Sequence, residues 1–413
     1  MATTVDIDAD RFRESFEAYS AIGATDAGGL HRLALTDEDR EARDLLAEDL
    51  DDLGLTVRVD ELGNTFARRP GRDPDAAPVL VGSHLDSQPN GGRFDGQLGV
   101  LTALETLRAF EDAGVETDRP VELVNWTNEE GSRFQQAMLG SSVAVGATDL
   151  ADALAMEDAE GVTVGEALER IGYDGDESPT IDPGDVHAYL ELHVEQGPKL
   201  ESSGDSVGVV DGVFGLSWME VRVEGQANHA GPTAMHDRQD ALVAATTAAG
   251  EIHDLPNRLS EDAVATVGRM DVSPNSINVV PDEVTFTVDV RSYDERVVAA
   301  APDAVEFEVA TACEREGTTY EFDRLWSIDP LTFSPVVRDA VAAGAEAAGA
   351  SHRRLVSGAG HDANYMAQVT ESGMLFVPSV DGITHAESEF TEWADCVAGA
   401  EAFANATLGL ATE

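Results

Sequence analysis

Apolar residues in the first half of the chain follow two spacings in turn. In residues 96–113 an apolar side chain stands at every third position from Leu98 to Phe110, which predicts a helix with one buried face. The runs at residues 79–81 and 121–126 are short and largely apolar, and they predict buried strands. Because strand and helix patterns alternate, we expect an α/β domain whose mainly parallel sheet has helices on both faces.

The pattern changes after about residue 211. Residues 218–223 and 283–291 alternate between apolar and polar positions, as half-exposed strands do, and a helical pattern follows each of them. The full order is strand, helix, strand, strand, helix, strand, which is the ferredoxin-like α+β arrangement. Patterns of the first kind then resume. We therefore expect residues 213–328 to be inserted between the two parts of the first domain, 1–212 and 329–413.

Acidic residues far outnumber basic ones. The 413 residues include 79 Asp and Glu against 26 Lys and Arg, and the formal net charge is -53. Repulsion among so many like charges destabilises a compact fold at low salt, but at about 1 M salt the screening length shrinks to roughly 3 Å. Lys199 is the single lysine, and the acids are dispersed along the chain. This composition favours the high-salt cytoplasm of a halophile over binding of a polycation.

Several classes of protein are disfavoured by what the sequence lacks. No basic patch is present to neutralise phosphates, which argues against a nucleic-acid partner. No apolar run approaches the length of a membrane span, and the first residues have no signal-like apolar core. We therefore expect a soluble cytoplasmic protein without a membrane partner. Cys313 and Cys396 are too few for a disulfide framework and are expected to be small buried residues.

Side chains that commonly bind metals stand at or after the ends of expected strands. They come from separate parts of the chain: His84, Asp86, Asp95, Glu129, Glu130, His193 and His385. In an open α/β sheet the carboxyl ends of the strands line one crevice, where ligands bind. Acids and imidazoles at several strand ends should therefore meet at one rim. The sequence predicts a metal site there, with a catalytic task.

The acidic residues suit different tasks. Asp95 lies in a glycine-rich loop before an expected helix, and its two carboxylate oxygens can bridge two cations. Glu129 and Glu130 are neighbours in an extended segment, so their side chains point in different directions. One can bind a metal while the other takes a proton from water. Asp86 follows His84 by two residues, which suits a carboxylate that orients the imidazole.

Several short strings resemble the carbamoylase branch of the M20 metallopeptidase superfamily, in the same order and over nearly the whole chain. They read GSHLDS (82–87), GGRFDG (91–96), NEEGSRF (128–134), ELHVEQGP (191–198), HAGPT (229–233), NVVP (278–281), DVR (289–291) and SGAGHDA (357–363). This branch contains N-carbamoyl-L-amino acid hydrolases, β-ureidopropionases and allantoate amidohydrolases. The resemblance implies a catalytic α/β domain and an inserted lid domain through which a homodimer forms.

The resemblance also implies two divalent cations per subunit. His84, Asp95 and His193 would hold one cation, and Asp95, Glu130 and His385 would hold the other, with Asp95 as the bridge. Such a set of imidazoles and carboxylates suits Zn, Mn, Co or Ni and does not choose among them. Exopeptidases of the superfamily typically carry a carboxylate where His193 stands, so this histidine favours the carbamoylase branch.

Further roles follow from the same resemblance. Glu129 would be the general base, and Asp86 would orient His84. Arg291 would form a forked pair with the carboxylate of a small-molecule substrate. His229, supplied by the partner subunit's lid, would stabilise the oxyanion. The substrate-binding positions of the family are matched by Gln196, His229, Asn278, Arg291, Gly360 and His361, although for His361 a structural turn fits equally well.

The expected activity is hydrolysis of the linear C–N bond of an N-carbamoyl-L-amino acid. Allantoate amidohydrolase and β-ureidopropionase are alternatives that would use the same site with a different pocket. An M20 exopeptidase or an N-acyl amino acid deacylase is a more distant alternative, against which His193 argues. A protein that merely binds metal or amino acids would leave Glu129 without a task.

Overall fold

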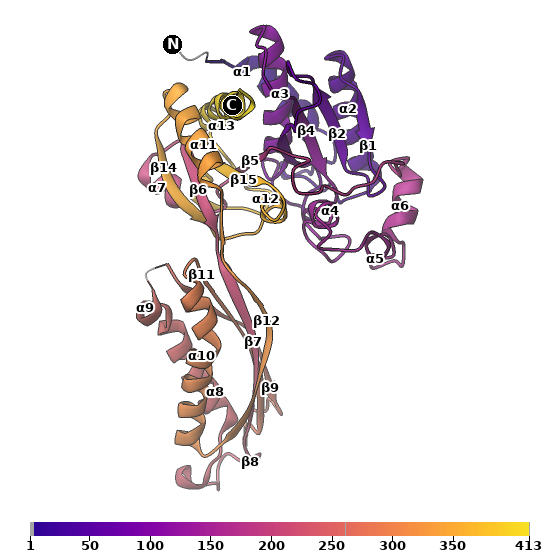
Figure 1. Cartoon of the computed structure of the whole chain (residues 1–413). Coiled ribbons are helices and arrows are strands. Elements are labelled where there is room, and N and C mark those ends of the chain that lie inside the picture. Colours follow the sequence, from indigo (N-terminus) through magenta and orange to yellow (C-terminus); the bar gives the residue numbers. More distant parts are fainter. Residues whose placement is uncertain (1–3, 261, 413) are drawn as a thin grey trace. The chain divides into compact units, whose positions relative to one another are not determined.

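The chain forms two compact units in the computed structural model, which describes residues 4–260 and 262–412. One unit combines the chain up to Asp211 with the part from Phe333 onward, and the other is Gly212–Thr332 (Figure 1). The inserted domain was expected at residues 213–328, a few residues from the division observed here.

A mixed sheet runs through the first unit. Its central strands lie parallel to one another in the order β4, β3, β5, β15, and antiparallel strands continue the sheet on both sides. In spatial order its strands are β1 (Val57–Val59), β2 (Thr65–Arg69), β4 (Val121–Trp126), β3 (Val79–His84), β5 (Ala188–Val194), β15 (Glu371–Val377), β6 (Val207–Val213) and β13 (Leu331–Thr332), while β14 (His352–Ser357) also pairs with β6. The expected α/β class with a mainly parallel central sheet is confirmed.

Long helices cover one face of this sheet. Val79 and Val81 of β3 enter a core with apolar residues of these helices, whereas Leu80 between them is equally buried outside that core. This alternation places buried side chains on both faces of the strand. The helices of this core are α1 (Ala9–Ser20), α2 (Asp37–Asp52), α3 (Gln97–Asp112), α11 (Pro335–Ala347) and α13 (Trp393–Ala411).

Shorter helices complete the first unit. α12 packs against β5, β15 and α4. A smaller apolar cluster joins α4, α5 and α6 to the segment around Phe134. These helices are α4 (Leu139–Ala144), α5 (Leu150–Leu154), α6 (Val164–Ile171), α7 (Lys199–Ser203) and α12 (Asp362–Met366), with a 3-10 turn at Val380–Gly382.

The second unit has the expected β-α-β-β-α-β order. Its antiparallel sheet runs β12, β7, β11, β9, and α8 and α10 pack on the face that carries Val221 and Phe286. The elements are β7 (Gly215–Glu224), α8 (Ala241–Asp254), α9 (Pro256–Leu259), β9 (Val264–Ser273), β11 (Glu283–Ser292), α10 (Glu295–Glu316) and β12 (Thr319–Ile328). A small ribbon pairs β8 (Asn228–His229) with β10 (Val279–Val280), and a 3-10 turn spans Met235–Asp237.

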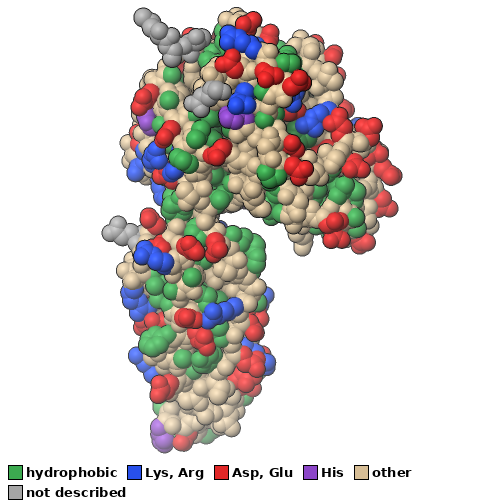
Figure 2. All heavy atoms as spheres, viewed as in Figure 1, with side chains coloured by type: hydrophobic (Ala, Val, Ile, Leu, Met, Phe, Trp, Pro, Cys, Tyr) green, Lys and Arg blue, Asp and Glu red, His purple; other side chains and the backbone are tan. Residues whose placement is uncertain are grey.

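Acidic side chains are scattered over the visible face of both units and form no single tract (Figure 2). Among the described helices, none is long and apolar enough to cross a membrane.

We expect the melting temperature to rise steeply between about 0.1 M and about 2 M KCl, because salt screens the mutual repulsion of these charges. Differential scanning calorimetry at a series of KCl concentrations measures this effect. Equal melting temperatures at the two ends of the series would contradict an adaptation to high salt.

Candidate metal centre

His84 is the last residue of β3 and is held by main-chain atoms. Its Nδ1 donates a hydrogen bond of 2.9 Å to the carbonyl oxygen of Asp86, so the proton of the neutral ring lies on Nδ1. Burial lowers the pKa of His84 to about 4, which keeps the ring neutral. Its Nε2 is buried and has no hydrogen-bond partner among the described residues. The ring therefore presents an unpaired lone pair, as a metal ligand does.

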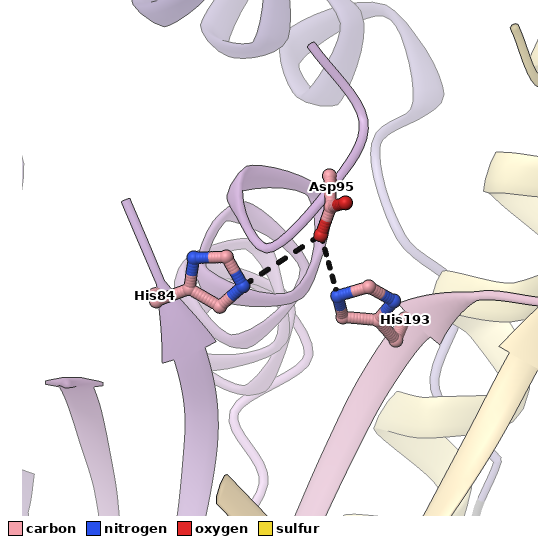
Figure 3. A group of neighbouring side chains, drawn as sticks. All are labelled: His84, Asp95 and His193. Carbon is pink, nitrogen blue, oxygen red and sulfur yellow. Dashed lines mark ion pairs between the residues drawn. The ribbon is translucent and has the colours of Figure 1, made fainter. Parts of the chain in front are cut away.

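His193 approaches from the neighbouring strand β5 with the same orientation. Its Nδ1 donates to the carbonyl oxygen of Val194 at 3.0 Å, and its Nε2 lies 2.9 Å from Oδ1 of Asp95. The Nε2 atom of His84 lies 3.7 Å from the same oxygen (Figure 3). The two imidazoles thus converge on one carboxylate oxygen from two parallel strands.

Asp95 is placed by the sharp turn that starts α3. Gly96 has a φ of 64° and stands at the N-cap of this helix. A Cβ atom on Gly96 would lie 2.2–2.4 Å from atoms of the His84 ring, so no larger residue fits there. The glycine allows the loop to bring Asp95 against both imidazoles, which explains why the sequence has glycine at this junction.

A second group forms on the other oxygen of Asp95. The Nε2 atom of His385 lies 3.3 Å from Oδ2 of Asp95 and 3.6 Å from Oε2 of Glu130. Glu130 is held by Gln88, whose main-chain N–H and side-chain amide donate to its two carboxylate oxygens at 3.1 and 2.8 Å. The structure therefore brings together both ligand groups that the resemblance implied, with Asp95 common to them.

Asp86 contacts His84 through its main chain rather than its carboxylate. The nearest carboxylate oxygen of Asp86 lies 3.9 Å from Nδ1 of His84, whereas the main-chain oxygen makes the hydrogen bond. The carboxylate instead accepts from the main-chain N–H groups of Glu129 and Glu130, at 3.2 and 3.3 Å. That Asp86 orients His84 stays a prediction; here its main-chain oxygen makes the hydrogen bond to the ring, and its carboxylate holds the glutamate loop.

Glu129 lies beside both groups without belonging to either. Its Oε2 is 3.5 Å from Nε2 of His84. Burial raises its pKa well above the ordinary value, and the negative charges of Asp362, Glu130 and Asp86 add to the shift. A carboxylate that lies beside a cation site and belongs to neither ligand group is placed to accept and return a proton.

Divalent cations fit the electrostatics of this centre. Burial is the main cause that raises the pKa of Glu130 to about 8, and the negative charge of Asp95 adds to it. Burial opposes protonation of His193, yet the Asp95 carboxylate outweighs it and raises the pKa to about 9. The hydrogen bond to Asp95 is the main cause that raises the pKa of His385, also to about 9. Carboxylates and imidazole Nε2 atoms in this arrangement are the donor set of first-row divalent metals.

The substrate-binding positions fall into both units. In the first unit, the amide nitrogen of Gln196 donates to Oδ2 of Asp95 at 3.1 Å. The His361 ring is buried, and its centroid lies 4.5 Å from that of the His193 ring. Its Nε2 atom lies 3.2 Å from the hydroxyl oxygen of Ser357, and Gly360 precedes it in the chain. His361 thus lies at the centre, with a structural hydrogen bond of its own.

The other three expected positions lie in the second unit. His229 is in β8, opposite Val279 of β10, and the carbonyl oxygen of Asn278 accepts from the main-chain N–H of Ala230 at 2.9 Å. Arg291 lies in β11 and forms an ion pair of 2.9 Å with Asp289. The ribbon thus brings His229 and Asn278 together within this unit.

Two residues at the centre were not expected from the sequence. The side-chain amide of Gln88 donates a hydrogen bond to Glu130, and Glu389 accepts hydrogen bonds from the Asp95 loop. Gln88 lies close to His84 in the sequence, which is a weak indication that it belongs to the centre. Glu389 is one acid among many in this chain, so its sequence context carried no signal.

Known proteins resemble this chain over almost its whole length. The profile of peptidase family M20/M25/M40 matches residues 80–408. An N-carbamoyl-L-amino-acid amidohydrolase of Rhizobium meliloti is 43% identical over 97% of this chain and 96% of its own. An allantoate amidohydrolase of Escherichia coli is 32% identical, over 95% and 97%.

A solved structure agrees with these matches. The crystal structure of an amidase of the hydantoinase/carbamoylase family from Burkholderia multivorans is 45% identical, covers 99% of both chains and has a TM-score of 0.95. The similarity extends over both units. The chain belongs to the M20/M25/M40 peptidase family.

Proposed function

We propose that this protein hydrolyses N-carbamoyl-L-amino acids to the amino acid, carbon dioxide and ammonia, with consumption of one water. The observation that carries the proposal is the convergence of the two ligand groups on Asp95, with Glu129 beside them, in a chain 43% identical to an amidohydrolase of this name. The reaction breaks a linear C–N bond outside a peptide.

The family is metal-dependent, and the centre would hold two divalent cations, one in each group. Bound cations of this kind polarise a carbonyl oxygen and lower the pKa of water. The protein's own residues complete the chemistry. Glu129 would take the proton of the attacking water and return it to the leaving nitrogen, while Asp86 holds the main chain of Glu129 in place. Zn, Mn, Co and Ni all suit these ligands.

The substrate would be held by the residues that match the family's substrate-binding positions. Arg291 would bind its carboxylate, and Gln196, Asn278, Gly360 and His361 would line the remaining contacts. His229 would donate to the oxyanion from the partner subunit's lid. This assignment requires a homodimer formed through the second unit. Separately, the net charge of -53 suits a salt-rich cytoplasm.

Replacing Arg291 by lysine is expected to raise KM by roughly tenfold or more, with a smaller change in kcat, because an ammonium cannot reproduce a forked pair with a carboxylate. The measurement is steady-state kinetics on a carbamoyl-amino acid and on its amide. Arg222→Lys, in the neighbouring strand β7, is the matched control. Should wild type hydrolyse the amide as well as the free acid, Arg291 is not the partner of that carboxylate.

The second candidate is allantoate hydrolysis, which the 32% identical relative from Escherichia coli supports. The deciding experiment is an ammonia-release assay in molar KCl with added Mn, Co or Zn. Its substrates are a series of carbamoyl-L-amino acids, ureidopropionate, allantoate, acetyl-amino acids and a dipeptide. We expect the highest kcat/KM for a carbamoyl-L-amino acid. A preference for allantoate would replace the proposed substrate, and cleavage of the dipeptide alone would remove the proposal.

A further inference from the structure

Glu389 is a buried carboxylate in the loop that carries His385, between β15 and α13. Its relative exposure is 4%, although the side chain of His385 in the same loop is 48% exposed. A buried charge is costly unless it is well hydrogen-bonded. The partners of Glu389 therefore indicate what keeps it there.

These partners belong to two loops far apart in the sequence. Oε1 of Glu389 accepts from the main-chain N–H groups of Phe94 and Asp95, at 3.1 and 3.0 Å. Oε2 accepts from the hydroxyl of Thr384 at 3.1 Å. One carboxylate thus links the loop that ends in Asp95 to the residue next to His385.

Gly92 shows how closely the carboxylate packs on the first loop. A Cβ atom at position 92 would lie 2.1 Å from Cδ and Oε1 of Glu389. The φ of Gly92 lies outside the left-handed region, so the backbone itself would accept another residue. The requirement for glycine comes from Glu389.

Thr384 can serve only one acceptor at a time. Its hydroxyl oxygen lies 3.1 Å from Oε2 of Glu389 and 3.4 Å from Oδ2 of Asp95, and a hydroxyl has one proton to donate. The shorter contact is to Glu389, so this hydroxyl connects Glu389 to the residue next to His385.

We propose that Glu389 is a positioning residue, which holds Asp95 and His385 at the separation that lets Asp95 serve both ligand groups. The inference rests on the proposed two-cation centre and assigns Glu389 no contact with substrate. Hydrogen bonds that orient metal ligands commonly change metal affinity by about 10–100-fold when they are removed. The carboxylate would act on both cations, because Asp95 belongs to both groups.

The test measures cation binding by titration calorimetry of metal-free protein with Mn²⁺ or Zn²⁺ in molar KCl. Glu389→Ala should weaken both binding events by about 10–100-fold. Glu389→Gln should stay closer to wild type, since its carbonyl oxygen can accept from both N–H groups and its amide can donate to Thr384. Thr384→Val should weaken mainly the event that involves His385. Glu387→Ala, in the same loop, is the control and should leave both events unchanged.

A double substitution tests the contact from the other side. Gly92→Ala should weaken cation binding in wild type, because the methyl group displaces the Glu389 carboxylate. In the Glu389→Ala background the same change should cost almost nothing, since the obstacle is gone. Equal effects of Gly92→Ala in both backgrounds would remove the packing argument.

The outcomes separate this inference from the function on which it rests. A wild-type protein that binds no pair of cations contradicts the proposed centre itself. A wild type that binds two, with Glu389→Ala binding both as tightly, overturns the positioning role alone. So does a loss in Glu389→Gln as large as that in Glu389→Ala. If the alanine variant does not fold, the glutamine and Thr384→Val variants decide the matter.

Discussion

Replacing Glu129 by glutamine is expected to lower kcat by about 10²–10⁴, the usual contribution of a positioned general base. Cation binding should persist, because Glu129 belongs to neither ligand group. Glutamine keeps the shape of the side chain and the main-chain bond to Asp86, so the loss isolates the proton acceptor. Ammonia release gives kcat, and metal analysis of the same samples gives the cation content.

Glu130→Gln is the matched control for this result, because it makes the same change one residue along. Glu130 lies 3.6 Å from His385 within the second ligand group, so its loss should lower the cation content. If Glu129→Gln loses a cation and Glu130→Gln keeps both, the two glutamates have exchanged roles.

Replacing His229 by alanine is expected to lower kcat by about 10²–10³, if the imidazole donates to the developing oxyanion. The hydrogen bonds around His229 support its role as a donor to the oxyanion. The main-chain N–H of Gly231 donates to Nδ1 of His229 at 3.0 Å, so in the neutral ring the proton lies on Nε2. That N–H is the group that an oxyanion would accept from. His236→Ala, in the same segment, is the control, since His236 matches no functional position.

Mixing two inactive variants tests whether His229 acts across a dimer. A hybrid of His229→Ala and Glu129→Gln subunits would contain one site with both groups intact and one site with neither. With free exchange, about half of the dimers are hybrids, so activity should return to about a quarter of wild type. If no activity returns once subunit exchange has been verified, His229 acts within its own chain or takes no part.

Much of the centre was predictable because its residues stand at the ends of strands. His84 ends β3 and His193 lies near the end of β5, and parallel strands bring such ends to one rim. Strand spacing and the class of the side chain were enough to predict that these residues meet. The inserted unit was equally predictable from the sequence. Apolar and polar residues alternate along its strands, and this alternation is absent from its helices.

The hydrogen bonds that orient those residues came from the tertiary structure. Strand alternation suggested that the Asp86 carboxylate faces His84, but the main-chain oxygen of Asp86 makes the hydrogen bond to the ring, and the carboxylate accepts from the glutamate loop. Glu389 lies 294 positions from Asp95, and no local pattern distinguishes it from the other acids of so acidic a chain. Periodicity reports which face a side chain is on, because it reflects the local backbone. Which partner that side chain meets depends on loops brought together by folding, and such contacts leave no periodic trace in the sequence.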